Sequence, residues 1–127
     1  MIKVILDTLK NDAALQALLQ GTAADKKIYA FTANTLNSIA YSFTNLISNK
    51  VIGQARLELT INTLLTDYGL NMDIADRVKQ LLLTLADQQF NDEILEIEQN
   101  GGGSLRNEET KTVHNKLILT IKYKERK

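Results

Sequence analysis

The hydrophobic residues of this chain recur first with a helical period. Near the N-terminus they form one helical stripe, made of Ile2, Ile5, Leu6, Leu9 and Ala13. The phase of the pattern shifts at Asn11 and Asp12, and either residue can cap a second short helix. We expect that helix to run to Gly21, where a glycine would supply the left-handed residue that ends it.

The middle of the chain changes to a pattern of alternation. Residues 22–38 are mostly polar and predict a loop with room for a short edge strand. Ile39, Tyr41 and Phe43 then alternate with smaller or polar residues, which predicts a strand with one buried face. Asn49 and Lys50 predict a turn. The clearest half-buried strand follows, with its apolar face formed by Ala55, Leu57, Leu59 and Ile61.

A second helical stripe follows Tyr68 and Gly69. Its members are Ile74, Val78, Leu81, Leu82 and Leu85. We expect this helix to begin at Asn71 or Asp73 and to be reinforced by an ion pair between Asp73 and Arg77, four residues later. The stripe should pack on the sheet.

The C-terminal part predicts a hairpin of two alternating strands. The apolar residues occupy odd positions, at Leu95, Ile97, Val113, Leu117, Leu119, Ile121 and Tyr123. The polar residues occupy even positions, at Glu96, Glu98, His114, Lys116, Thr120 and Lys122. Pairing odd with odd positions would bury one face and pair charges on the other. Ile118 falls on the charged face, where it is either incidental or an interface residue.

A polar, glycine-rich run separates these two strands. It consists of Asn100, Gly101, Gly102, Gly103, Ser104, Leu105, Arg106, Asn107, Glu108, Glu109 and Thr110. A tight hairpin needs only about two to five loop residues, so this run is either a binding loop or a plain solvated connection. We expect it to be mobile in the free subunit, because it buries too little to offset the entropy of ordering. Leu105 and Arg106 would be its contact residues.

The order of elements is helix, strand, strand, helix, strand, strand. It predicts one α+β domain over residues 1–127, with a small four-stranded, mostly antiparallel sheet and two main helices packed on one face. A chain of 127 residues buries enough surface for a core without disulfide or metal staples. Two helices cannot cover both faces of such a sheet. We therefore expect the other face to be solvated or to bind a partner.

The charges argue against a nucleic-acid-binding protein. Fifteen basic residues balance fifteen acidic ones, so the chain lacks a broad positive field. The segment from Asp87 to Glu98 is acidic and that from Lys111 to Lys127 is basic. These segments neutralise each other within the hairpin, or an acidic edge of one copy meets a basic edge of the next and builds a ring. The interface residues would then be Glu96, Glu98, Lys116, Ile118 and Lys122.

Membrane and export signals are missing from the pattern as well. The N-terminal segment is interrupted by charges, and no apolar run reaches the length of a membrane span, so we expect a soluble, unexported protein. The absence of cysteine excludes disulfides and thiolate chemistry, and a reducing cytoplasm is the simplest match.

Catalytic and metal-binding patterns are weak. His114 could face Glu96 or Glu98 as a general base, with Ser104 as a nominal nucleophile, but an exposed strand face lacks the dry, concave site that catalysis needs. The carboxylates Asp92, Glu93, Glu96 and Glu98 do not have the spacing of an EF-hand. The glycine run precedes a strand, whereas a phosphate loop opens onto a helix. We expect neither enzymatic activity nor a metal or cofactor.

The arrangement resembles the tail-completion proteins of long-tailed phages and prophages. The resemblance lies in the segment LKNDAALQALLQG (Leu9 to Gly21), in KIYA (Lys27 to Ala30) and in the strand ARLELTINTL, which begins at Ala55. A helix and a terminal hairpin with a basic tail complete it. Members of this family often carry a proline near the first strand, and this chain has none.

The resemblance implies a structural virion protein. Such a protein is assembled in the host cytoplasm into a six-fold ring that caps the tail tube and joins it to the head connector. The partners implied are further copies of the chain, the tail tube protein and the head connector protein. The alternatives are another head–tail connector, a minor tail subunit, or a small enzyme that uses His114.

Overall fold

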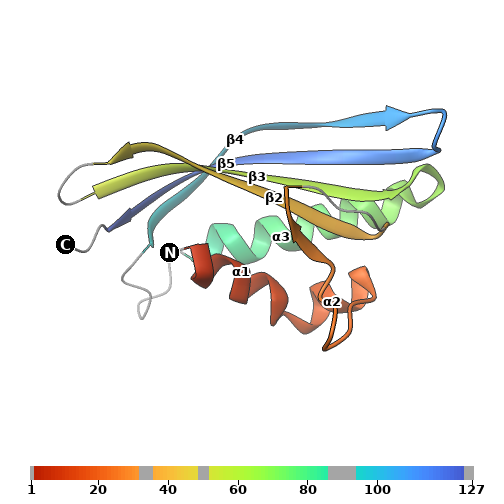
Figure 1. Ribbon diagram of the computed structural model, residues 1–127, viewed down its shortest axis with the longest axis horizontal. Helices are drawn as coiled ribbons and strands as arrows, with labels where there is room; N and C mark the ends of the chain where they lie inside the picture. The colour runs from red at the N-terminus through yellow and green to blue at the C-terminus, as the bar shows by residue number, and fades with distance from the viewer. Residues whose placement is uncertain (1, 32–35, 49–51, 86–93, 125–127) are drawn as a thin grey trace.

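The computed structural model describes residues 2–31, 36–48, 52–85 and 94–124, and places helices on one face of a single sheet (Figure 1). The helices are α1 (Ile2–Lys10), α2 (Ala13–Leu19) and α3 (Tyr68–Leu85), and a 3-10 turn (Leu65–Asp67) precedes α3. The strands are β1 (Ile28–Ala30), β2 (Ser38–Ser48), β3 (Ile52–Leu64), β4 (Ile94–Asn107) and β5 (Thr112–Lys124). The α+β class is therefore confirmed.

The sheet has five strands rather than the four expected, in the order β1-β2-β3-β5-β4. The additional strand is β1, the short edge strand for which the mainly loop-like segment 22–38 left room, and it pairs parallel to β2, with Ile28 opposite Ile39. The other strand pairs are antiparallel. The sheet is thus mixed, and its two edge strands are the three-residue β1 and the much longer β4.

The N-terminal helices meet at Asp12. Its carboxylate accepts a hydrogen bond of 2.8 Å from the Leu15 amide and caps α2, as the sequence predicts. The predicted end of α2 is wrong, because Gln20 and not Gly21 adopts the left-handed conformation, with φ of 58°. A Cβ at Gly21 would meet the side-chain oxygen of Gln16, which lies at the far end of a flexible side chain.

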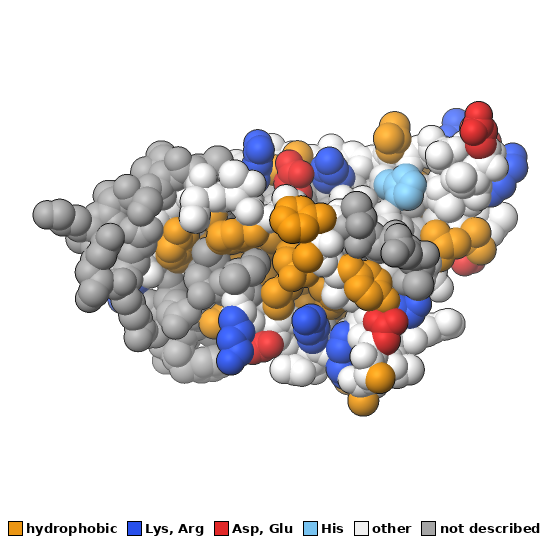
Figure 2. Space-filling model, in the orientation of Figure 1, with side chains coloured by type: hydrophobic (Ala, Val, Ile, Leu, Met, Phe, Trp, Pro, Cys, Tyr) orange, Lys and Arg blue, Asp and Glu red, His pale blue; other side chains and the backbone are white. Residues whose placement is uncertain are grey.

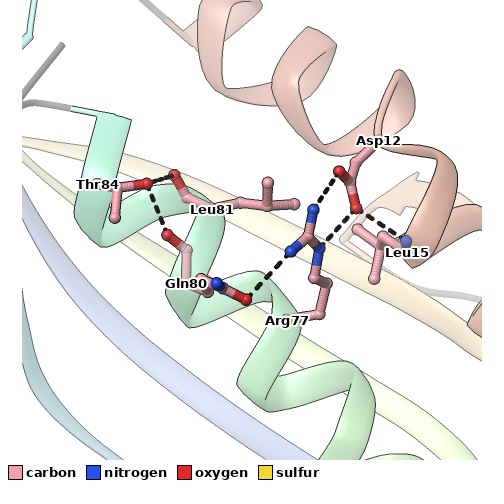
Figure 3. A network of polar contacts seen from close by, with 6 residues as sticks. All are labelled: Asp12, Leu15, Arg77, Gln80, Leu81 and Thr84. Atoms are coloured by element: carbon pink, nitrogen blue, oxygen red, sulfur yellow. Dashed lines mark hydrogen bonds and ion pairs between the residues drawn. The ribbon is translucent and has the colours of Figure 1, made fainter.

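Helix α3 begins at Tyr68, earlier than the predicted Asn71 or Asp73. Asn71 is fully buried, and its amide nitrogen donates to the Ile61 carbonyl at 3.0 Å and to Thr63 Oγ1 at 3.1 Å. Asn71, which the sequence suggests as a helix cap, thus joins α3 to β3. The predicted Asp73–Arg77 pair is also replaced, because Arg77 binds Asp12 on the neighbouring helix (Figure 3).

The hydrophobic core lies between the sheet and the three helices. Its strand side includes Leu57, Leu59 and Ile61, and its α3 side includes Ile74, Val78 and Leu82, all fully buried. These are the strand and helix faces that alternation and helical periodicity predict, so the assignment of both faces to one core is confirmed.

The C-terminal hairpin departs most from its prediction. Strand β4 continues through Asn107, so Gly101 to Asn107 are paired with β5 and only residues 108–111 connect the strands. The register shifts at Leu95 and again at Asn100, which breaks the rule that odd positions pair with odd. Leu95 is consequently 41% exposed, and Ile94 takes the buried place expected for it.

Some predictions fall outside the described residues. These are the turn at Asn49 and Lys50, the acidic residues Asp87, Asp92 and Glu93, and the last residues of the basic tail. Within the residues that the structure describes, no helix is long and apolar enough to cross a membrane.

Candidate functional site: a glycine groove on the open face of the sheet

The helices cover one face of the sheet and leave the other open (Figure 1). Strand pairing places the residues of the open face in rows across β3, β5 and β4. One row is Glu58, Ile118 and Gly101, the next is Thr60, Lys116 and Gly103, and the third is Asn62, His114 and Leu105. The open face is the one that the sequence predicts to be solvated or to bind a partner.

The charges of this face are largely paired within the chain. Lys122 Nζ lies 3.5 Å from Glu96 Oε2, as the hairpin pattern predicts. Lys116 Nζ lies 3.9 Å from Glu58 Oε2, on the neighbouring strand. Glu98 lies opposite Thr120 and has no ion-pair partner among the described residues. Exposed pairs of this kind contribute about 0–1 kcal/mol each, so they adjust the surface without fixing the fold.

The glycine run forms a groove in the open face. Gly101 and Gly103 have no side chains to cover the row positions beside Ile118 and Lys116, and this leaves a volume of about 310 Å³. A Cβ at Gly103 would meet nothing within 4 Å. We call this feature the glycine groove; it is lined by Thr60, Gly102, Gly103, Ser104, Leu105, His114, Lys116 and Ile118.

Gly102 has a different function from its neighbours. Its φ is 147°, a backbone conformation that L side chains rarely adopt, and a Cβ would collide with the carbonyl oxygen of Lys116. It lies opposite Leu117, so it belongs to the helix-covered side. Gly102 therefore allows β4 to approach β5 closely just after the register shift at Asn100.

The hairpin tip is folded into a turn rather than a long loop. Asn107 Oδ1 accepts hydrogen bonds from the backbone amides of Glu109 at 3.0 Å and Thr110 at 3.2 Å. Arg106 Nε lies 3.6 Å from Glu108 Oε1. Leu105 is 72% exposed. Of the two predicted contact residues, Leu105 thus borders the groove, and Arg106 points its charge towards the turn.

The proposed catalytic grouping is not assembled. His114 Nδ1 lies 2.5 Å from Asn62 Oδ1, and its Nε2 lies 3.3 Å from Thr112 Oγ1. Ser104 Oγ lies 3.5 Å from the Tyr68 hydroxyl, on the other face of the sheet. The histidine, pale blue in Figure 2, is visible at the surface. Its neighbours are an amide and a hydroxyl in place of Glu96 or Glu98.

The described part of the chain contains no candidate metal site. No group of three or more histidine, cysteine, aspartate or glutamate side chains lies close enough to hold an ion there.

Phe31 is an exposed aromatic residue that the sequence pattern did not single out. It follows β1, is 76% exposed and has φ of 66°, in the left-handed region that bulky residues avoid. Its amide donates to the Tyr41 carbonyl at 2.7 Å, and this bond holds the strained conformation. The sequence feature that could have indicated this exposed residue is a phenylalanine within a mostly polar segment.

The segment before β1 is organised around Asp25. Its carboxylate accepts hydrogen bonds from the Tyr29 hydroxyl at 2.7 Å and from the Lys27 amide at 3.0 Å. The Tyr29 bond, together with that from Lys27, holds the pKa of Asp25 below its usual range. These contacts fix the backbone that leads through β1 to Phe31.

Comparison with known proteins gives a match in fold only. No family model matches the sequence, and no curated protein matches it. A chain in the structure "Virion of native gene transfer agent (GTA) particle" is similar, with a TM-score of 0.68 and 12% sequence identity. The match covers 95% of this chain and 92% of that chain. At this identity, the likeness establishes a shared fold over nearly the full length of both chains.

Proposed function

We propose that this chain is a structural subunit of a phage-like particle. The observation that carries the proposal is the fold shared, over almost the whole length, with a chain of a gene transfer agent virion. The uncovered sheet face, with its groove and exposed leucine, supports it, because a subunit of an assembly needs surfaces for its neighbours.

Within such a particle, we propose tail completion as the specific function. The resemblance of the N-terminal helices and of the strand at Ala55 to tail-completion proteins supports this assignment. The subunit would form a ring of six copies at the end of the tail tube, stop the growth of the tube and dock the head connector. Its partners are then other copies of the chain, the tail tube protein and the head connector protein. The function is structural and requires no catalytic residue.

Labelling of particles tests the location. An epitope tag on the chain should be detected at the head-proximal end of the tail, and loss of the chain should give separate filled heads and tails. A label on heads alone would favour a head-side connector, and a label along the tail would favour a minor tail subunit. Either result would contradict tail completion.

The enzyme alternative has its own test. His114→Gln keeps a polar side chain beside Asn62 and Thr112 but removes the imidazole base. The purified natural chain should show no hydrolase activity. A hydrolase activity of the natural chain that His114→Gln abolishes, with the amount of folded protein unchanged, would support the enzyme alternative.

A further inference from the structure

We infer that the glycine groove of one copy receives the Phe31 side chain of a second copy. The inference rests on the proposed function as an assembling subunit and identifies the contact through which neighbouring subunits join. It is carried by two features at opposite edges of the sheet, a protruding aromatic side chain and an apolar depression.

The protruding feature is Phe31. Its side chain is 76% exposed although phenylalanine is among the most hydrophobic residues, and its backbone is held at φ of 66° by the bond to Tyr41. A left-handed conformation at a bulky residue is costly, and such strain tends to occur at sites of interaction. A rigidly presented aromatic side chain is also the type of residue that dominates interface energies.

The receiving feature is the glycine groove. Its surface is mainly apolar, supplied by Leu105, Ile118 and the backbone of the glycines, and its volume of about 310 Å³ has room for one aromatic side chain. Leu105 forms an exposed wall, and Gly103 leaves open space on the floor. An inserted ring would cover Leu105 and Ile118 together.

The two features cannot meet within one chain. Phe31 follows β1, at one edge of the sheet, while the groove lies across β3, β5 and β4, towards the other edge, and β2 separates them. Contact between them therefore requires a second copy. Because each copy then offers one Phe31 and one free groove, the contact is heterologous and repeats from copy to copy, as a closed ring requires.

Charges of opposite sign lie beside the two features, once Asp25, which is bonded to Tyr29, and Lys116, which is paired with Glu58, are set aside. Lys26 and Lys27 precede β1 on the Phe31 side. Glu98 lies on the open face of β4, next to the groove, and has no ion-pair partner among the described residues. In the proposed contact, Lys26 and Lys27 of one copy carry charges opposite to that of Glu98 of the next copy. They would orient the approaching copies and make association sensitive to salt.

Cysteine cross-linking tests the contact directly, because the natural chain contains no cysteine. A mixture of A30C and R106C proteins, which keep Phe31 and Leu105 and carry the thiols on their exposed neighbours, should form a cross-linked heterodimer with a short bis-maleimide. The double variant A30C/R106C should form a ladder of multimers. The control is A30C with L83C, since Leu83 is an exposed leucine on α3, away from the groove. Equal cross-linking in the control, or none in the A30C and R106C mixture, overturns the contact.

A groove-filling variant tests it without touching Phe31. G103L places a side chain in space where a Cβ meets nothing, so folding should be preserved, and association should weaken at least tenfold in sedimentation. G69L is the control, because Gly69 also faces open space but lies at the start of α3. Unchanged association of G103L overturns the proposal, and so does a natural chain that remains monomeric at every concentration.

Cross-linking inside purified particles separates the two proposals. If the tagged double variant is incorporated at the head–tail junction but yields no ladder, the contact is wrong and tail completion stands. If the ladder forms in solution but the chain is missing from particles, the contact stands and the proposed function is wrong.

Discussion

Asp12 and Arg77 form a two-pronged ion pair that joins the N-terminal helices to α3 (Figure 3). Arg77 Nη2 lies 2.6 Å from Asp12 Oδ1, and Nε lies 2.8 Å from Oδ2. The same carboxylate caps α2 through the Leu15 amide. One side chain thus fixes the start of a helix and the packing of that helix on its neighbour, 65 positions away in the sequence.

This pair predicts a pH dependence of stability. The hydrogen bond from Arg77, aided by that from the Leu15 amide, holds the pKa of Asp12 below its usual range. Because the folded-state pKa is lowered, the contribution is fully present above the unfolded value of about 3.9 and is lost as pH falls through the folded value. Urea unfolding between pH 7 and pH 3 should show a steeper loss for the natural chain than for Asp12→Asn.

The control for this prediction is Asp7→Asn, because Asp7 is exposed on α1. It should retain the acid dependence of the natural chain. Asp12→Ala should in addition cost about 1 kcal/mol at pH 7 through loss of the helix cap. Parallel pH profiles for Asp12→Asn and the natural chain would show that the pair contributes nothing to acid stability.

The shared core of β3 and α3 predicts large effects from truncation. Leu59 and Leu82 are fully buried, so Leu59→Ala or Leu82→Ala should each cost about 2–5 kcal/mol of unfolding free energy. Leu83→Ala, on the exposed side of α3, should change little. Thermal and denaturant unfolding measure both, and unchanged midpoints for the two buried positions would contradict the observed packing.

The sequence could predict these core faces because each is a local repeat. Leu57, Leu59 and Ile61 alternate along one strand, and Ile74, Val78 and Leu82 follow a helical period, so no distant contact is needed to recognise them. The buried Asn71 escaped prediction for the opposite reason. An asparagine near a helix start is usually a cap, and only the position of β3 shows that its amide has partners inside the core.

The edges of the sheet could not be predicted in the same way. Gly101 to Gly103 have low strand propensity, yet pairing with β5 keeps them in β4, so tertiary context overrides the local preference. The register shifts at Leu95 and Asn100 depend on that pairing, and they do not change the hydrophobic pattern of the sequence in a recognisable way. Strand β1 is too short to show alternation. The groove as a cavity and the exposure of Phe31 follow from these edges. Most of the residues that line the groove could be predicted as candidate contacts from the sequence, namely Gly102, Gly103, Ser104, Leu105, Lys116 and Ile118.

Gly102 and Gly103 should differ sharply when replaced by alanine. Gly102→Ala forces a side chain into a φ of 147° and against the Lys116 carbonyl, which should cost about 1–3 kcal/mol. Gly103→Ala meets open space and should be nearly neutral for folding. Denaturant unfolding of both variants gives the comparison. Equal stability of the two would mean that β4 does not follow the observed path past β5.

Leu105 should matter for assembly and not for folding. Its side chain is 72% exposed, so Leu105→Ser removes little buried surface and should leave the thermal midpoint within a few degrees of the natural value. Leu105 forms a wall of the groove, which we propose is filled by a neighbouring subunit in the particle. The same change should therefore lower the yield of joined particles and leave free heads and tails. Electron microscopy of lysates and infectious titre measure the outcome.

Leu95→Ser is the matched control for this prediction, since Leu95 is an exposed leucine on the same strand but outside the groove. Normal titre with Leu105→Ser, or an equal defect with Leu95→Ser, would show that the groove is not a subunit contact in the particle.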